Sequence, residues 1–287
     1  MRKNYASISP SAKALLLTKA LTDIPYMADA AKLVLGEAAT AMHKPKQDNA
    51  LFLLRLLHFE VRYKSVDQML AQLGGTNIFE VSSGYSFRGL HMAITRPDVI
   101  YVDTDLPGVV EDKLDLLDQL VETKGLDLQG ELIIKPLNAL DEAEFMKIVE
   151  LFPPGPIIIV NEGLLMYLNN DEKATLCHII HKVLKKRGGY WITADIYIKK
   201  DLNDMIVPDK FSQFLAAHNV EENKFESFTQ AEEFFNTHGF KIHKKAAPID
   251  RQTLSALNHI DPKILQTYAQ KTNSNTRIRE TWALVVD

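Results

Sequence analysis

The feature that most constrains this chain is a pair of short apolar runs, each followed by small or acidic residues. The first run, Ile78–Val81, leads into Ser82–Gly84, and the second, Val99–Val102, leads into Asp103–Asp105. A strand, a glycine turn, a helix, a strand and an acid follow one another in this order in nucleotide-binding βαβ units. The turn lets a ligand approach the backbone, and the acid accepts hydrogen bonds from a ribose diol. We therefore expect a binding site where these two strands end.

The turn is poor in glycine, which bears on the ligand. The dinucleotide fingerprint has three glycines, whereas this turn has only Gly84 and Gly89 and also carries Tyr85. A pyrophosphate needs close contact with amide groups at a helix N-terminus, so NAD and FAD are disfavoured. A nucleoside without phosphates, such as S-adenosylmethionine, needs only one close backbone approach and an acid. The spacing alone is equally compatible with an ordinary turn in which Gly84 forms a tight corner.

A third acidic position follows another apolar run. Residues 156–160 are rich in β-branched side chains, which favours a buried strand, and Glu162 and Gly163 come directly after Asn161. Ligands bind where the strands of a parallel sheet have their carboxyl ends. Glu162 is therefore expected to face the same crevice as Gly84. The alternative is that Glu162 only caps the next helix.

Composition excludes several classes of function. The net charge of −4, with 46% hydrophobic and 24% charged residues, is that of an ordinary globular protein and gives no support to nucleic-acid binding. The single cysteine, Cys177, excludes an internal disulfide and a multi-cysteine metal site. No cluster of Asp and His stands out, so we expect no metal. The N-terminal region has no unbroken apolar stretch, so we expect no signal peptide, no membrane association and a cytoplasmic location.

The order of apolar patterns predicts an α/β fold with a mostly parallel sheet and helices on both faces. Residues 9–73 are predicted to be helical, with a loop at Pro45 and an end at Gly74-Gly75. The predicted strands are 77–82, 99–103, 131–135, 156–161, 189–195, 239–246 and 280–286, and the clearest helices between them are 109–121 and 171–186. We expect an N-terminal helical cap over residues 1–75, a core over 76–287, and an inserted lid at about 196–230.

Three segments together resemble the leucine carboxyl methyltransferase family, and in particular its bacterial branch of O-methyltransferases linked to polyketide biosynthesis. They are NIFEVSSGYSFRGL from residue 77, IYVDTDLPGVVEDK from residue 100, and IVNEGLLMYLNNDEKATL from residue 159. The opening segment SISPSAKALLLTKALTDIP is also similar to that branch. The resemblance spans roughly residues 5–195. It implies a seven-stranded class I methyltransferase fold of Rossmann-like type and S-adenosylmethionine as methyl donor.

The resemblance also implies roles for individual residues. Gly84 would lie under the donor at the end of the first strand, and Asp105 would bind the ribose, with Asp103 as the alternative. Glu162 would lie near the methionine end of the donor, and Arg62 would pair with the donor's carboxylate. An arginine on a solvated helix face is the alternative for Arg62. The remaining candidates for cofactor binding are Pro136 and Leu137, which match the stretch that flanks the adenine, and Glu80 in the first strand.

One departure from the family pattern concerns the glycine turn. Family members commonly have Gly-Ala-Gly there, whereas this chain has Ser82-Ser83-Gly84 and keeps the arginine position as Arg88. The missing glycine leaves open a non-catalytic nucleoside-binding or scaffold protein of the same fold. A nicotinamide-dependent oxidoreductase is a further alternative.

Methyl transfer needs the protein mainly to orient two reactants and exclude water. A carboxylate acceptor is already anionic, whereas a phenol would need a base, and the sequence singles out no such base. Tyr167 is the one candidate for a catalytic role at the methyl-transfer site. The expected partner is a small-molecule acceptor, and the sequence leaves its identity and the oligomeric state open.

Overall fold

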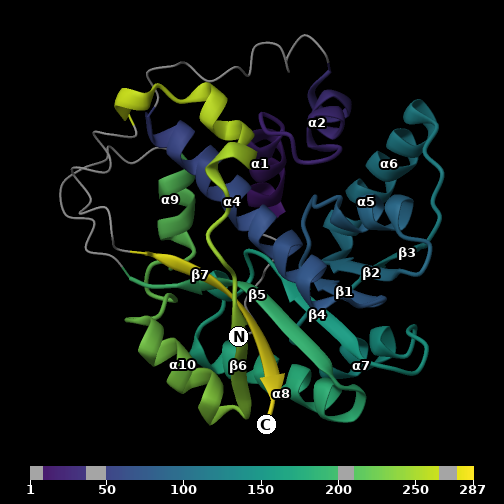
Figure 1. Cartoon of the computed structure of the whole chain (residues 1–287), viewed down its shortest axis with the longest axis vertical. Helices are drawn as coiled ribbons and strands as arrows, with labels where there is room; N and C mark the ends of the chain where they lie inside the picture. Colours follow the sequence, from purple (N-terminus) through teal and green to yellow (C-terminus); the bar gives the residue numbers. More distant parts are fainter. Residues whose placement is uncertain (1–8, 37–49, 200–209, 265–276) are drawn as a thin grey trace.

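The computed structural model describes residues 9–36, 50–199, 210–264 and 277–287 (Figure 1). The strands are β1 (Asn77–Val81), β2 (Ile100–Asp105), β3 (Glu131–Pro136), β4 (Ile157–Asn161), β5 (Gly189–Tyr197), β6 (Phe240–Lys245) and β7 (Arg279–Val286). The α-helices are α1 (Ser9–Lys19), α2 (Met27–Leu35), α4 (Ala50–Leu73), α5 (Arg88–Thr95), α6 (Pro107–Lys124), α7 (Glu142–Val149), α8 (Asn170–Arg187), α9 (Lys210–Ala217) and α10 (Phe228–Thr237). Short 3-10 helices are η2 (Leu165–Tyr167), η3 (Arg251–Thr253) and η4 (Ser255–His259).

The seven strands form one sheet in the order β3-β2-β1-β4-β5-β7-β6. Strands β1 to β5 pair in parallel, and β7 pairs antiparallel with both β5 and β6. The strand order turns at β1, so the carboxyl ends of β1, β2 and β4 meet at one edge of the sheet. In parallel sheets such an edge forms a crevice that binds ligands. The expected fold class, a mostly parallel α/β sheet of Rossmann-like type with seven strands, is confirmed.

Helices cover both faces of the sheet (Figure 1). On one face, buried side chains of α7, α8 and α10 pack against β1, β4, β5 and β7 in the larger core cluster. On the other face, α4 packs against β5 and β7, and α5 and α6 lie over β2 and β3. Helix α2 packs against α6, and α1 packs against α2 and α4. Cys177 of α8 is fully buried and belongs to the larger core cluster.

Local sequence signals explain where the helices that border the crevice begin and end. Helix α6 has Pro107 in its first turn, where a missing N–H is tolerated, and ends at Gly125 with φ of 59°. Helix α8 begins with a capping box, in which Asn169 and Glu172 each accept a hydrogen bond from the other's backbone amide. Helix α6 starts directly after β2, and α8 starts after the loop that follows β4, so these helix starts fix where the two loops end.

The N-terminal region differs from the expectation in one respect. Residues 20–26 form turns between α1 and α2 rather than continuous helix. The apolar pattern continues through this stretch because Leu21 is partly buried and Ile24 is buried, but α1 ends at Lys19 and Pro25 disfavours helical backbone before α2. Residues 37–49 and 200–209, which include the predicted loop at Pro45 and part of the predicted lid, lie outside the described residues. The division of the chain at residue 75 and the lid remain predictions.

Candidate functional site

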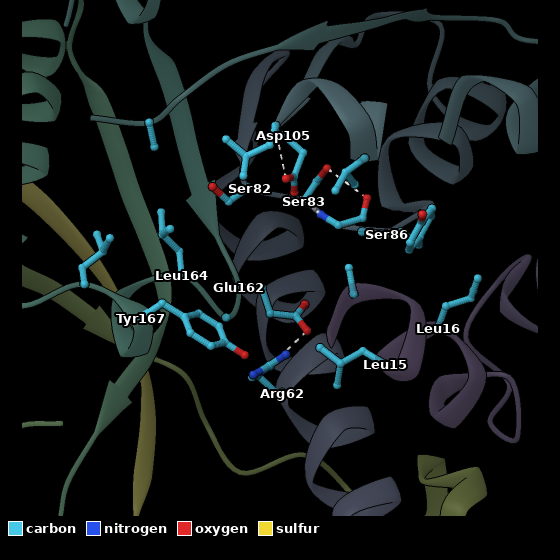
Figure 2. A pocket seen from close by; sticks show the side chains of 18 of the residues that line it. Leu15, Leu16, Arg62, Ser82, Ser83, Ser86, Asp105, Glu162, Leu164 and Tyr167 are labelled. Atoms are coloured by element: carbon cyan, nitrogen blue, oxygen red, sulfur yellow. Dashed lines mark hydrogen bonds and ion pairs between the residues drawn. The ribbon is translucent and has the colours of Figure 1, made fainter. Parts of the chain in front are cut away.

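A cavity lies at the sheet edge where β1, β2 and β4 end, and it holds about 1010 Å³ of empty space that is partly open to solvent. Figure 2 shows side chains from α1, α4 and three strand ends pointing into it. Its walls are formed by Ala12, Leu15, Leu16, Lys19, Arg62, residues 82–86, Asp105, Leu106, Val109, residues 138–140, residues 162–164, Tyr167 and Leu168. The turn after β1, the end of β2 and the loop after β4 therefore border the same cavity.

The glycine turn after β1 is formed by two residues in the left-handed region. Ser82 has φ of 54° and Gly84 has φ of 55°. The amide of Ser83 donates to the carbonyl oxygen of Thr104 at 3.0 Å, and the amide of Gly84 donates to the Asp105 carboxylate at 2.7 Å. A Cβ on Gly84 would lie 3.4 Å from the Cβ of Ala12. The turn is thus closely packed, and the amides of Ser83 and Gly84 already donate hydrogen bonds within the protein.

Two aspartates at the end of β2 have different positions. Asp105 lines the cavity and accepts hydrogen bonds from the amides of Gly84 and Leu106, both at 2.7 Å. Asp103 lies deeper, where it accepts hydrogen bonds from Lys113 and Ser83. Burial raises the pKa of Asp105 above its usual range, and the two amide donors offset part of that shift. Asp105 therefore reaches the cavity, whereas Asp103 supports the turn from below.

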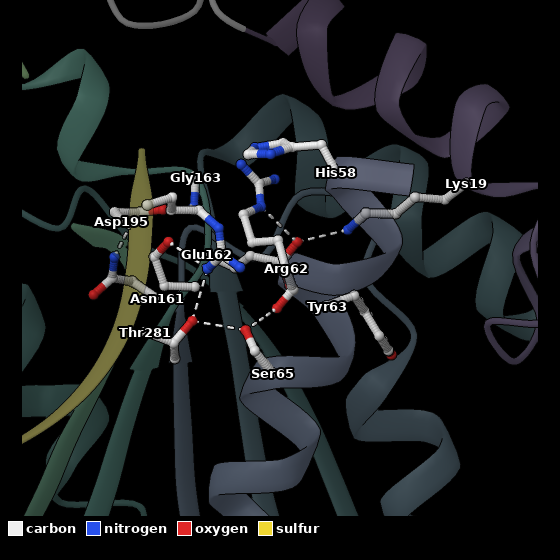
Figure 3. Close-up of polar contacts among 12 residues, drawn as sticks. Lys19, His58, Arg62, Tyr63, Ser65, Asn161, Glu162, Gly163, Asp195 and Thr281 are labelled. Atoms are coloured by element: carbon white, nitrogen blue, oxygen red, sulfur yellow. Dashed lines mark hydrogen bonds and ion pairs between the residues drawn. The ribbon is translucent and has the colours of Figure 1, made fainter. Parts of the chain in front are cut away.

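Glu162 is the centre of a buried group of charges (Figure 3). One carboxylate oxygen accepts from Lys19 Nζ at 2.8 Å and Arg62 Nε at 3.1 Å, and the other accepts from Arg88 Nη2 at 2.8 Å. Burial alone would raise the pKa of Glu162, but the three cations outweigh it and hold the pKa well below its usual range. Glu162 caps no helix, because the N-cap of α8 is Asn169.

Arg62 is buried with 2% of its surface exposed, which excludes the solvated position considered for it. Besides Glu162, its Nη1 donates to Tyr197 Oη at 3.2 Å, and His58 Nε2 lies 2.8 Å from the same oxygen. Burial lowers the pKa of the His58 imidazole well below its usual range, and nearby cations such as Arg279 act in the same direction. The guanidinium of Arg62 is thus held by Glu162 at Nε and by Tyr197 at Nη1, and Arg62 also lines the cavity.

Glu80 does not line the cavity. It is fully buried in β1, where it forms an ion pair with Arg88 and accepts a hydrogen bond from Tyr101 Oη at 2.7 Å. Arg88 also pairs with Asp67 at 2.7 Å. Glu80 therefore holds Arg88, and Arg88 in turn contacts Glu162, so the Glu80 side chain is linked to the cavity only through these two residues.

Of the remaining candidates, only Tyr167 lies at the cavity. Tyr167 belongs to η2 and lines the cavity, and Figure 2 shows its hydroxyl directed toward Arg62. Pro136 and Leu137 do not line it, and the next three residues, 138–140, do so instead. Leu137 is buried, and its amide donates to the Asp105 carbonyl oxygen at 2.8 Å.

Sequence reasoning missed two charged residues of the site. Lys19 is the last residue of α1, and a lysine within the apolar stretch of residues 14–21 was a usable signal. Asp195 lies near the end of β5 and accepts hydrogen bonds from the loop that carries Glu162. Its signal was its place at the end of the predicted strand 189–195, comparable to the places of Asp105 and Glu162.

Within the described ranges, no three His, Cys, Asp or Glu side chains gather in a way that could bind a metal ion. None of the helices in the described part of the chain combines the length and apolar character that a membrane crossing requires.

Comparison with known proteins gives distant structural similarities only. No family model matches the chain, and no curated protein matches it. The chain is similar to mitomycin 7-O-methyltransferase MmcR, with 12% identity, a TM-score of 0.47, and 92% of this chain and 69% of that chain covered. It is similar to magnesium protoporphyrin IX methyltransferase ChlM from Synechocystis PCC 6803 with bound SAH, with 9% identity, a TM-score of 0.46, and 92% and 96% covered. It is also similar to LepI in complex with SAH and a substrate analogue, with 10% identity, a TM-score of 0.46 and 76% of this chain covered; the chain spans only 46% of LepI's length.

Proposed function

We propose that this protein is an S-adenosylmethionine-dependent O-methyltransferase that methylates a carboxylate or hydroxyl of a small-molecule acceptor. The observation that carries the proposal is the distribution of charge in one cavity. Asp105 lines it at the end of β2, and Glu162, Arg62 and Lys19 line it at the end of β4. A sugar diol matches the first position, and an amino-acid group with one positive and one negative charge matches the second.

The residues present fit this donor. Asp105 uses one oxygen for each amide, and a carboxylate has about four acceptor sites in all, so it keeps capacity for ribose hydroxyls. Leu106 and Val109 supply an apolar surface beside it. In this proposal Arg62 binds the donor's carboxylate through its planar fork.

When bound, S-adenosylmethionine would supply an electrophilic methyl group and its own leaving group. The chain's residues orient the two reactants and exclude water. Glu162 stays ionised over a wide pH range because of its low pKa, so it can hold an ammonium group rather than act as a proton shuttle. Tyr167, with its hydroxyl at the cavity rim, is the residue proposed to contact the acceptor. The leucine carboxyl methyltransferase family, in its polyketide-type branch, remains the proposed relationship.

The geometry disfavours the nicotinamide alternative. A pyrophosphate would need free amides at the turn before α5. The amides of Ser83, Gly84 and Ser86 already donate to Thr104, Asp105 and Ser83. The Asp105 carboxylate at this turn would also repel a phosphate.

One observation favours a non-catalytic nucleoside-binding protein: Ser82 occupies a position where members of the family that the sequence resembles commonly have glycine. Ser82 nevertheless adopts the conformation that glycine would take, and so the turn forms.

Isothermal titration calorimetry with S-adenosylmethionine, S-adenosylhomocysteine and NAD tests the proposal. We expect heat of binding with the first two and none with NAD. Binding should also stabilise the fold, by about 2.7 kcal/mol at a hundredfold excess over Kd. Absence of binding by both adenosyl ligands on folded protein would refute the proposal. Binding of donor without methyl transfer to any carboxylate or phenol in an acceptor panel would favour the non-catalytic alternative.

Two substitutions assign the ends of the donor. Asp105→Ala should weaken S-adenosylhomocysteine binding by about tenfold or more, within the range for a lost hydrogen bond to a charged group, while Asp118→Ala on the exposed face of α6 should not. Arg62→Ala should weaken S-adenosylhomocysteine more than adenosine, because adenosine lacks the carboxylate. Equal losses for both ligands would remove Arg62 as the carboxylate partner, and unchanged affinity in Asp105→Ala would remove Asp105 as the ribose acceptor.

A further inference from the structure

Asp195 is a buried carboxylate behind the loop that follows β4 (Figure 3). One of its oxygens accepts a hydrogen bond from the amide of Gly163 at 2.6 Å. The other accepts from the amides of Leu164 at 2.7 Å and Leu165 at 3.2 Å. Three successive backbone amides thus point at one side chain that has only 2% of its surface exposed.

No lysine or arginine forms an ion pair with Asp195 among the residues that the structure describes. A buried carboxylate needs compensation by charge or hydrogen bonds. Here hydrogen bonds come from the three amides and from Asn161 of β4, whose Nδ2 donates to Asp195 at 2.7 Å, and the charges of Arg62 and Arg279 also favour the carboxylate. Because the three amide bonds depend on the conformation of the loop, the carboxylate favours one loop conformation over others.

Glu162 lies between two residues that are both bound to Asp195. Asn161 precedes it and Gly163 follows it, so the backbone on each side of Glu162 is tied to the same carboxylate. Gly163 has φ of 88°, and a Cβ there would lie 3.2 Å from Arg62 Nη2. The loop therefore rests directly on the guanidinium that Glu162 contacts.

From these contacts we infer that Asp195 is a positioning residue, which acts through the loop to hold Glu162 at the amino-acid end of the donor. This inference rests on the proposed function. Its consequence is specific: loss of Asp195 should impair recognition of the amino-acid end and leave recognition of the adenosine end intact, because the contacts of Asp105 and the glycine turn do not involve Asp195.

The first test compares two ligands in calorimetry, S-adenosylhomocysteine and methylthioadenosine, which lacks the amino-acid group. Asp195→Asn should weaken S-adenosylhomocysteine by about tenfold or more, and methylthioadenosine by less than about twofold. Thr193→Val is the matched control. It removes a buried hydroxyl on the same strand that accepts hydrogen bonds from Asn161 Nδ2 at 3.1 Å and from the Asp195 amide at 3.3 Å, but from no loop amide. Equal losses for both ligands, no loss for either, or the same pattern in Thr193→Val would overturn the inference.

A double-mutant cycle tests whether Asp195 acts through Glu162. On a Glu162→Gln background, Asp195→Asn should change S-adenosylhomocysteine affinity by less than about twofold, because coupled residues are non-additive. Full additivity would show that Asp195 acts by another route.

The hydrogen bonds from the amides of residues 163–165 to Asp195 form a clamp on the loop. Amide hydrogen exchange tests this clamp on the wild-type protein without ligand. The amides of residues 163–165 should exchange far more slowly than those of an unstructured peptide, and in Asp195→Asn they should accelerate while those of β4 do not. Rapid exchange at residues 163–165 in the wild type would overturn the inference even if Asp195→Asn fails to fold. If wild-type protein shows the protection but binds neither adenosyl ligand, the proposed function fails and the clamp stands.

Discussion

Ser82 adopts a left-handed backbone conformation that side chains rarely take, with φ of 54°. A left-handed conformation costs a residue with a Cβ about 1–2 kcal/mol, and the Ser82 hydroxyl makes no hydrogen bond within the described residues that would offset it. The position immediately follows β1 and lines the cavity. The strain is therefore stored at the site, which is where strained backbone commonly occurs.

Ser82→Gly should raise the free energy of unfolding by about 0.5 kcal/mol, since relief of the strain exceeds the greater chain entropy of glycine. Ser82→Val should lower it by about 1 kcal/mol or more, because a β-branched residue is least tolerant of positive φ. Ser82→Ala, which keeps the conformation and removes only the hydroxyl, is the control and should have little effect. Urea denaturation of the three variants gives the comparison. Equal stabilities for the glycine and valine variants would contradict the assigned conformation.

At the same scale, the sequence was informative where a residue's role follows from its place in the chain. Three predicted residues come within about three positions of the end of an apolar run, and all of them line the cavity: Gly84, Asp105 and Glu162. Asp103 and Asp105 could not be separated, because strand alternation places both on one face; the burial of Lys113 beneath Asp103 decides their depth. Such a long-range contact has no local signal.

Helix α8 and the loop before it form the element that carries Glu162 and Tyr167 into the cavity. The capping box fixes the start of this helix, with the amide of Glu172 donating to the Asn169 side chain at 2.9 Å and the amide of Asn169 donating to Glu172 at 2.8 Å. The N-cap stands two residues after Tyr167. The stability of the first turn of α8 and the position of the loop before it are therefore linked.

Asn169→Ala should lower the free energy of unfolding by about 1 kcal/mol, because an N-cap side chain satisfies an otherwise unpaired amide. Asn170→Ala, at the adjacent exposed helical position, is the matched control and should change stability by less than about 0.5 kcal/mol. Thermal unfolding with both variants measures the difference. If the two variants lose the same stability, the cap contributes nothing and the loop has other support.

Strands and the longer helices were predictable as elements because apolar runs and helical stripes have clear periods. The helix expected at 171–186 is observed as Asn170–Arg187, and the strand expected at 131–135 as Glu131–Pro136. The turns at 20–26 were not predicted, since Leu21 and Ile24 maintain an apolar pattern through non-helical backbone. Tertiary packing of α1 and α2, which a single sequence does not reveal, sets that boundary.

At the scale of the whole molecule, Glu162 joins elements that are far apart in sequence. Lys19 of α1, Arg62 of α4 and Arg88 of α5 all contact it from outside the loop after β4. Each side chain in this group is nearly fully buried. Removal of one member of a buried ionic group is strongly destabilising, by about 3–5 kcal/mol, because it leaves charges without compensation.

The pH dependence of stability follows from the low pKa of Glu162. Its pKa in the folded protein lies well below the usual 4.5, so protonation favours the unfolded chain. The stabilisation by Glu162 is then fully present above about pH 4.5 and is lost as the pH falls toward its folded pKa. Glu162→Gln should be less stable than wild type by about 3 kcal/mol or more at pH 7, and this difference should shrink steadily below about pH 4.5.

Urea denaturation of wild type and Glu162→Gln between pH 3 and pH 7 measures that difference, with exposed Glu232→Gln of α10 as the control for loss of one carboxylate. Because Glu162 connects α1, α4 and α5 to the sheet edge, its protonation should weaken the whole fold rather than loosen one loop, and far- and near-ultraviolet circular dichroism should report one transition. A stability difference that stays constant across this pH range would mean that the carboxylate is not held ionised by its three cations, and the charge arrangement on which the donor site depends would be wrong.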